Sequence, residues 1–168
     1  MVRSLVKNIY IFILLVFLQV YVFNSIQFSG LINPYFYVIF ILLMPFETPG
    51  LVLLLSSFLL GLSVDIFTHT LGIHAAACTL MAFIRPQVLK AFSPRDGYES
   101  GTLPRISYFG LTWFVKYSII LILAHHFVLF YLEMFRLSDF FYTFLRVILS
   151  TLFTGLLIAI SQYFFFRR

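Results

Sequence analysis

Apolar residues occupy most of the chain, in six stretches separated by short polar or proline-containing segments. The stretches cover residues 9–28, 35–46, 51–67, 72–84, 108–132 and 140–166. About 20 apolar residues are enough to cross the hydrocarbon of a bilayer as a helix. The pattern predicts an all-α membrane protein of about six transmembrane helices, forming a single domain over residues 1–168.

The first stretch, 9–28, follows two basic residues, Arg3 and Lys7. A secretory signal peptide would have the same arrangement. However, the stretch is longer than a typical apolar signal region, and no cleavage site of small residues follows it. We therefore expect a retained first helix that enters the membrane from the cytoplasm.

The second stretch, 35–46, is only 12 residues long and follows a break at Asn33-Pro34. It ends at a turn over 45–50, which contains two prolines and a glycine. Such a segment either borrows flanking residues to cross the bilayer or enters and leaves on the same side. The charge distribution favours a crossing, because omitting it would place the two most basic regions of the chain on opposite sides.

Composition supports the membrane class. Of the 168 residues, 62% are hydrophobic and only 10% are charged, whereas soluble domains have about 45–50% and about 25%. Mean hydropathy is +1.04. A single cysteine, Cys78, excludes an internal disulfide. Basic residues beside membrane spans bind anionic lipid headgroups, which accounts for the net charge of +5. No nucleic-acid-binding motif is present in the sequence.

Basic residues indicate the orientation. Six crossings place eight of the eleven Lys and Arg residues on one side and only Arg136 on the other. By the positive-inside rule both termini and the loop at about 85–107 are cytoplasmic. In that loop we expect Arg85, Lys90 and Arg95 to contact anionic lipid or, alternatively, a cytoplasmic partner. The neighbouring apolar side chains Val88, Leu89 and Phe92 would dip into the headgroups.

Asp65 is the most informative polar residue, because it lies inside an apolar stretch where an unpaired charge costs a few kcal/mol. Ser57 and Gly61 precede it at intervals of four, so the three share one helical face suited to close packing. A ligand or proton site, or a carboxylate at the outer interface, are the alternatives. Arg146 lies at a similar depth in the outer half, which predicts an Asp65–Arg146 ion pair.

Catalytic and metal-binding motifs are not recognisable in the sequence. His69, His74, His125 and His126 all fall toward the outer side, and Asp65 with His69 could share a metal. Without a ligand motif such as H-E-x-x-H, interfacial histidines are the simpler interpretation. We expect no metal, no cofactor and no enzyme activity.

Several segments together resemble the MreD family of bacterial rod shape-determining membrane proteins. They are Asn33-Pro34, Gly61-Leu-Ser-Val-Asp65, Gly72-Ile-His-Ala-Ala76 and the basic loop that follows. Pro94-Arg-Asp-Gly-Tyr-Glu99 resembles a Bacteroidota-type version of the family. The resemblance extends over the whole chain in layout and is most specific between Gly61 and Ala76.

The resemblance implies a non-enzymatic subunit of the cell-elongation complex in the bacterial inner membrane. Such a subunit helps maintain cell shape and positions peptidoglycan synthesis through an MreC-like partner and other rod-complex members. It also implies a fold similar to the substrate-capture subunits of energy-coupling-factor transporters. The alternative function is therefore a small-molecule-binding subunit of a vitamin-type transporter. A homodimer is compatible with either function.

Overall fold

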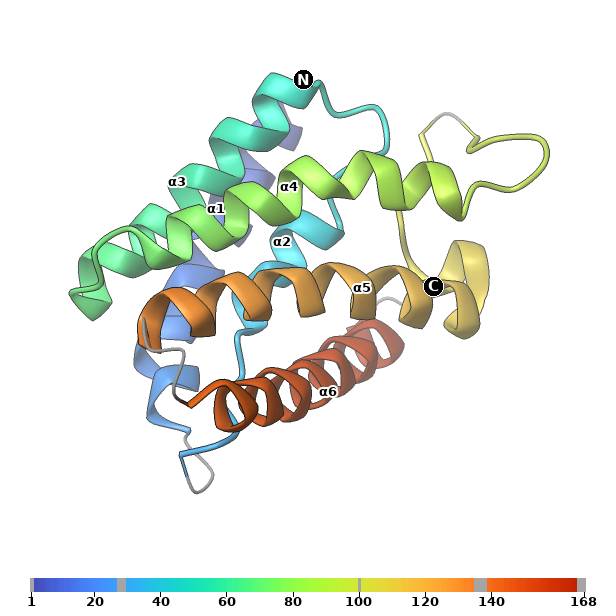
Figure 1. Cartoon of the computed structure of the whole chain (residues 1–168). Coiled ribbons are helices and arrows are strands. Elements are labelled where there is room, and N and C mark those ends of the chain that lie inside the picture. Colours follow the sequence, from blue (N-terminus) through green and yellow to red (C-terminus); the bar gives the residue numbers. More distant parts are fainter. Residues whose placement is uncertain (1, 27–29, 100, 135–138, 166–168) are drawn as a thin grey trace.

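A computed structural model describes residues 2–26, 30–99, 101–134 and 139–165 of the chain. Five long α-helices dominate (Figure 1): α1 (Val2–Tyr21), α3 (Gly50–Thr68), α4 (Ile73–Ala91), α5 (Ile106–Met134) and α6 (Phe140–Phe165). Three short elements complete the fold: η1 (Phe23–Ser25), η2 (Phe36–Val38) and α2 (Ile39–Leu42). No strand occurs in these ranges. Arg136 and Arg167–Arg168, which the orientation argument uses, lie outside them.

Neighbouring long helices pack as antiparallel pairs, α3 with α4 and α5 with α6, and α4 also contacts α5. In Figure 1 the short helix α2 lies in the middle of the molecule, where η2 contacts α1 and α6, and α2 contacts α1 and α4. The core therefore forms around a segment that is not itself a long helix.

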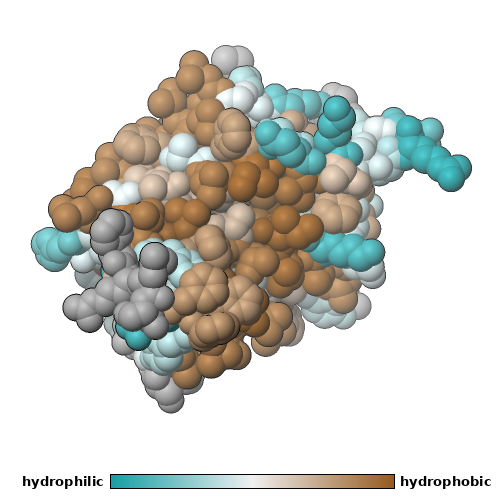
Figure 2. Space-filling model, viewed as in Figure 1, coloured by the Kyte–Doolittle hydropathy of each residue, from teal (hydrophilic) through white to brown (hydrophobic). Residues whose placement is uncertain are grey.

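Four helices are long and apolar enough to cross a membrane: Val6–Ser25, Gly50–Thr68, Ile106–Met134 and Phe140–Phe164. Large apolar side chains are exposed over much of the molecular surface, where they appear brown in Figure 2. A water-exposed protein would rarely leave so much apolar surface uncovered. The chain is an all-α membrane protein. The helix α4 is not among the four helices that are long and apolar enough to cross a membrane.

The segment 35–46 has a different structure from a transmembrane helix. Its helical part, residues 36–42, is only about 12 Å long at the usual rise per residue. Tyr37, Val38, Ile41 and Leu42 are fully buried. Non-helical backbone at membrane depth is tolerated only inside protein or beside a water-filled cavity, because its polar groups need partners.

Side chains from surrounding helices supply those partners. The backbone amides of Asn33 and Tyr35 donate to Ser150 Oγ at 3.0 Å and to Thr154 Oγ1 at 3.2 Å, both on α6. On α1, Gln19 donates to the carbonyl of Pro34 at 3.0 Å. The segment is thus held by polar residues that stand at buried positions on long apolar helices.

The helix α4 is longer than the sequence predicts. It continues through Pro86 to Ala91, so the expected loop at 85–107 is in fact 92–105. Val88 and Leu89 are 8% and 7% exposed and pack in the core, which makes the expectation that they dip into headgroups wrong. The charge of Arg85 and the proline at position 86 suggest a loop in the sequence, but both residues lie within the helix.

The loop between α4 and α5 folds against the end of the bundle. The rings of Tyr98 and Phe46 stack with centroids 4.1 Å apart. The Tyr98 hydroxyl donates to the carbonyl of Leu89 at 2.8 Å, and Trp113 Nε1 donates to that of Phe92 at 3.0 Å. Partial burial raises the pKa of the Tyr98 phenol above its usual value. These contacts hold the start and the middle of the loop against Phe46 and the helices α4 and α5.

Candidate functional site

Asp65 binds the N-terminus of the neighbouring helix α4. Its carboxylate accepts the backbone amides of His74 at 3.1 Å and Ala75 at 2.8 Å, together with the hydroxyl of Thr70. The residue before α4 is Gly72, which has no side chain to cap the helix. The first amides of a helix need acceptors, and they carry partial positive charge that favours an anion. Asp65 therefore caps α4 from outside, and its charge is balanced without a basic side chain.

Gly61 allows this contact by letting the two helices approach closely. A Cβ atom at Gly61 would lie 2.5 Å from the Cα of Ala75, closer than real Cβ atoms come to a neighbour. Ser57, one turn earlier, is also fully buried. The face formed by Ser57, Gly61 and Asp65 is thus buried, with Gly61 against the backbone of α4 and Asp65 at its N-terminus.

The predicted ion pair between Asp65 and Arg146 is not formed. Arg146 instead pairs with Glu133 at the end of α5, with NH1 3.1 Å from the carboxylate. Sequence reasoning had assigned Glu133 to a loop, but α5 continues to Met134 and presents it to α6. Similar depth in the bilayer does not by itself bring two side chains together, and here backbone amides are the partners of Asp65.

Arg146 is held on several sides. Its side chain is 11% exposed, and its guanidinium lies 4.3 Å from the centroid of the Phe130 ring. The Asn33 amide, oriented with its oxygen toward Arg146, accepts from NH2 at 2.6 Å. The position of the positive charge is therefore well defined.

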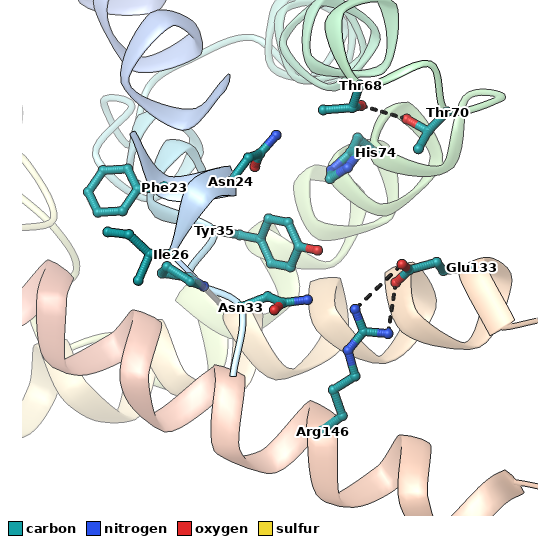
Figure 3. Close-up of a pocket in the computed structure, with 11 residues that line it drawn as sticks. Phe23, Asn24, Ile26, Asn33, Tyr35, Thr68, Thr70, His74, Glu133 and Arg146 are labelled. Carbon is teal, nitrogen blue, oxygen red and sulfur yellow. Dashed lines mark hydrogen bonds and ion pairs between the residues drawn. The ribbon is translucent and has the colours of Figure 1, made fainter. Parts of the chain in front are cut away.

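A polar cavity of about 260 Å³ lies beside this pair (Figure 3). Its lining at the α3–α4 junction is at the end of the molecule opposite the 92–105 loop (Figure 1). Its lining comes from the end of α1, the 33–35 segment, the α3–α4 junction, α5 and α6. Besides Arg146, its lining residues with polar side chains are Asn24, Asn33, Tyr35, Thr68, Thr70, His74 and Glu133. Convergent polar groups in a hollow are typical of small-ligand sites.

Next to the cavity, a hydrogen-bonded cluster is buried in the centre of the helices. The Tyr37 hydroxyl lies 2.9 Å from His74 Nδ1 and 2.9 Å from His125 Nε2, and Cys78 Sγ is 3.7 Å from the same hydroxyl. A hydroxyl has one hydrogen to donate, so one imidazole must donate to Tyr37 while the other accepts from it. His74 also lines the cavity and so connects the two features.

The histidines do not assemble the metal site that the sequence left open. His69 follows the last residue of α3 and has a left-handed backbone conformation. It is exposed and is not among the partners of the Asp65 carboxylate. His126 is occupied by the carbonyl of Ile122 at 2.8 Å and by Thr154 Oγ1 at 3.3 Å. Within the ranges that the structure describes, no group of three or more potential ligands could hold a metal ion.

Arg85 is buried inside the protein and has internal hydrogen-bond partners. It is 1% exposed, its Nε donates to the Tyr117 hydroxyl at 2.9 Å, and its NH2 donates to the carbonyl of Met44. The Tyr117 hydroxyl in turn donates to the carbonyl of Leu42 at 2.9 Å. Arg85 therefore satisfies the end of the buried α2 segment, whereas Lys90 and Arg95 are exposed as expected.

Sequence reasoning missed Tyr37, Tyr117 and Glu133 as site residues. For Tyr37 and Tyr117 the available signal was a hydrogen-bonding side chain within an apolar stretch, which is expensive in lipid unless it has a partner. Glu133 lies just after the stretch 108–132 and carried no such signal. Comparison with protein-family models, curated proteins and solved structures finds no match. The functional argument therefore rests on the geometry described above.

Proposed function

We propose that this protein is a non-enzymatic, MreD-type subunit of the bacterial cell-elongation complex. In this role it would act with an MreC-like partner to position peptidoglycan synthesis and maintain cell shape. The observation that carries the proposal is the α3–α4 junction. The residues of the resemblance, from Gly61 to Ala76, include both halves of a single contact, in which Gly61 allows close approach and Asp65 caps α4.

A membrane scaffold needs helices with fixed relative positions, so that a partner meets a constant surface. Asp65 and Arg85 serve this purpose near opposite ends of α4: one holds its N-terminus, and the other ties it to the α2 segment. Both polar groups are used in contacts within the bundle. Such use is what a structural subunit requires.

The proposal includes six crossings of the inner membrane with both termini in the cytoplasm. Tyr37 contacts His74 near the start of α4, and Met44 contacts Arg85, about 16 Å further along that helix. The segment between them thus advances through the bundle alongside α4. Together with α4 and the four apolar helices it would give the six crossings that the positive-inside rule favours.

The exposed residues Lys90 and Arg95 remain candidates for contact with anionic lipid or a cytoplasmic partner. Their backbone belongs to the end of α4 and to a loop anchored by Tyr98, so their charges would be presented on a defined surface. We keep a homodimer as a further arrangement of the subunit.

The polar cavity favours a second candidate function, a small-molecule-binding subunit similar to those of energy-coupling-factor transporters. Such a subunit needs a hollow with convergent polar groups open to the outer side, which the 260 Å³ cavity would provide. The transporter function also requires a permease and an ATPase as partners.

Depletion of the protein in its host tests the proposed function. A rod-shaped host should round up and lyse, and expression of the wild-type chain in trans should restore rods. Gly61→Ala, whose Cβ meets the backbone of α4, should restore them poorly, while the matched control Gly155→Ala on α6, whose nearest neighbour is the end of the flexible Ile119 side chain, should restore them well. Normal rod growth after clean deletion would refute the assignment.

A further inference from the structure

The polar cavity of about 260 Å³ brings two opposite charges together with neutral hydrogen-bonding groups. Glu133 and Arg146 approach it from α5 and α6, and Thr70 and His74 from the α3–α4 junction (Figure 3). The cavity is smaller than the about 300–1,000 Å³ usual for drug-sized ligands. A fitting occupant is therefore small and polar.

The two charged side chains differ in freedom. Arg146 is 11% exposed and held by Phe130 and Asn33, whereas Glu133 is 41% exposed. In addition, Arg146 Nε is buried without a hydrogen-bond partner among the described residues. Glu133 can therefore move aside while Arg146 stays in place.

We propose that this cavity binds a small zwitterion that carries a primary ammonium and a carboxylate or phosphate a few bonds apart. The anionic group would meet Arg146, and the ammonium would meet Glu133. Glu133 and Arg146 are paired with each other, so an anion alone that took Arg146 would leave Glu133 unpaired, and a cation alone that took Glu133 would leave Arg146 unpaired, which is costly in a partly buried site. A zwitterion gives each side chain an opposite charge.

Neutral groups of the lining complete the site. Thr68 and Thr70 share a hydrogen bond of 2.9 Å, and Thr70 also donates to Asp65. Among the described residues His74 Nε2 makes no hydrogen bond, while its Nδ1 is bound to the Tyr37 hydroxyl. A bound ligand would touch the α3–α4 junction directly, so binding should stabilise the folded protein.

This chemistry occurs in free amino acids and in the ethanolamine-phosphate headgroup of a lipid. The inference concerns binding by the isolated protein and stands whether or not the protein serves the elongation complex. Rod growth after deletion would refute the proposed function and leave the site untouched. Absence of zwitterion binding would refute this inference and leave the proposed function untouched.

Thermal unfolding of the full chain in nanodiscs tests the proposal. In discs of phosphatidylglycerol alone, L-alanine or O-phosphoethanolamine should raise the unfolding temperature, whereas acetate, inorganic phosphate and ethanolamine at the same concentration should not. If the headgroup of an intact lipid is the ligand, phosphatidylethanolamine in the discs should raise the unfolding temperature without any free ligand.

Variants connect the effect to the cavity. Glu133→Gln retains an acceptor for Arg146 on a half-exposed side chain and should still fold, yet weaken zwitterion binding at least about tenfold. Lys116→Gln, at an exposed position outside the cavity lining, is the matched control and should bind like the wild type. The proposal is overturned if neither free zwitterion nor phosphatidylethanolamine stabilises the protein. It is equally overturned if singly charged ions stabilise it as well, or if Glu133→Gln responds fully.

Discussion

The carboxylate of Asp65 accepts the backbone amide of Ala75 at 2.8 Å, so a residue on α3 caps the first turn of α4. Two consecutive amides, His74 and Ala75, share the same carboxylate. A buried acid in a membrane protein invites a search for a buried base, yet here the counter-charge is the N-terminus of a helix. That contact links the residues that carry the proposed MreD resemblance to the stability of the protein.

Replacing Asp65 should destabilise the protein according to how many amides lose their acceptor. Asp65→Ala leaves two buried amides unpaired, at about 1–3 kcal/mol each, while Asp65→Asn retains one acceptor oxygen and should lose less. Chemical unfolding of the purified protein in detergent would give the order wild type, Asn, Ala. Equal losses for Asn and Ala would show that the amide contacts are unimportant.

A double-mutant cycle separates the cap from the ion pair that the sequence predicts. Asp65 and Arg146 have different partners, so the losses from Asp65→Ala and Arg146→Ala should add within about 0.5 kcal/mol. The pair Glu133→Ala and Arg146→Ala should instead show coupling. Strong coupling between Asp65 and Arg146 would contradict the arrangement described here.

Gly61→Ala should lower stability by about 1–3 kcal/mol, because the new methyl group meets the backbone of α4. Gly155→Ala is the matched control on α6, since its methyl group meets only the end of the Ile119 side chain, which can rotate. Thermal unfolding of both variants measures the difference. A Gly61→Ala protein as stable as Gly155→Ala would mean that α3 and α4 are further apart.

Arg85→Ala should lower folded yield strongly, since it removes the donor to Met44 and leaves Tyr117 with one partner fewer. Lys90→Ala and Arg95→Ala, both exposed, should change stability by no more than about 0.5 kcal/mol. Fluorescence-detected size-exclusion chromatography compares the three. If Arg85→Ala remained monodisperse at wild-type yield, the buried anchor would be disproved.

Cysteine labelling tests the topology. Cys78 is fully buried, so the native protein should react little with membrane-impermeant thiol reagents. A cysteine near Gly97 should react only from the cytoplasmic side, and one near Ser138, which lies outside the described residues, only from the outer side. Labelling of both from the same side would rule out six crossings.

The apolar pattern predicts the long helices well, because the length and hydropathy of a lipid-facing helix are local properties. The stretches 51–67 and 140–166 agree with α3 and α6 within a residue or so at each end. Local pattern failed at Arg85 and Pro86, where a charge and a proline inside a helix look like a loop. Only the distant partners Met44 and Tyr117 explain their burial.

The candidate site was predictable in part. The spacing of Ser57, Gly61 and Asp65 indicated a packing face, but the partner of Asp65 could not be deduced. Backbone amides are present in every residue and leave no signal in composition. Glu133 was missed as the partner of Arg146 because its place at the end of α5 depends on where that helix ends.

Affinity purification of the tagged protein from its host's membranes tests the proposed function most directly. In mild detergent, quantitative mass spectrometry should find a single-span, coiled-coil MreC-like protein as the main enriched partner. Gly155→Ala should retain that partner, and the matched variant Gly61→Ala should lose most of it. Enrichment of a transporter permease and its ATPases, with no MreC-like protein, would contradict the account.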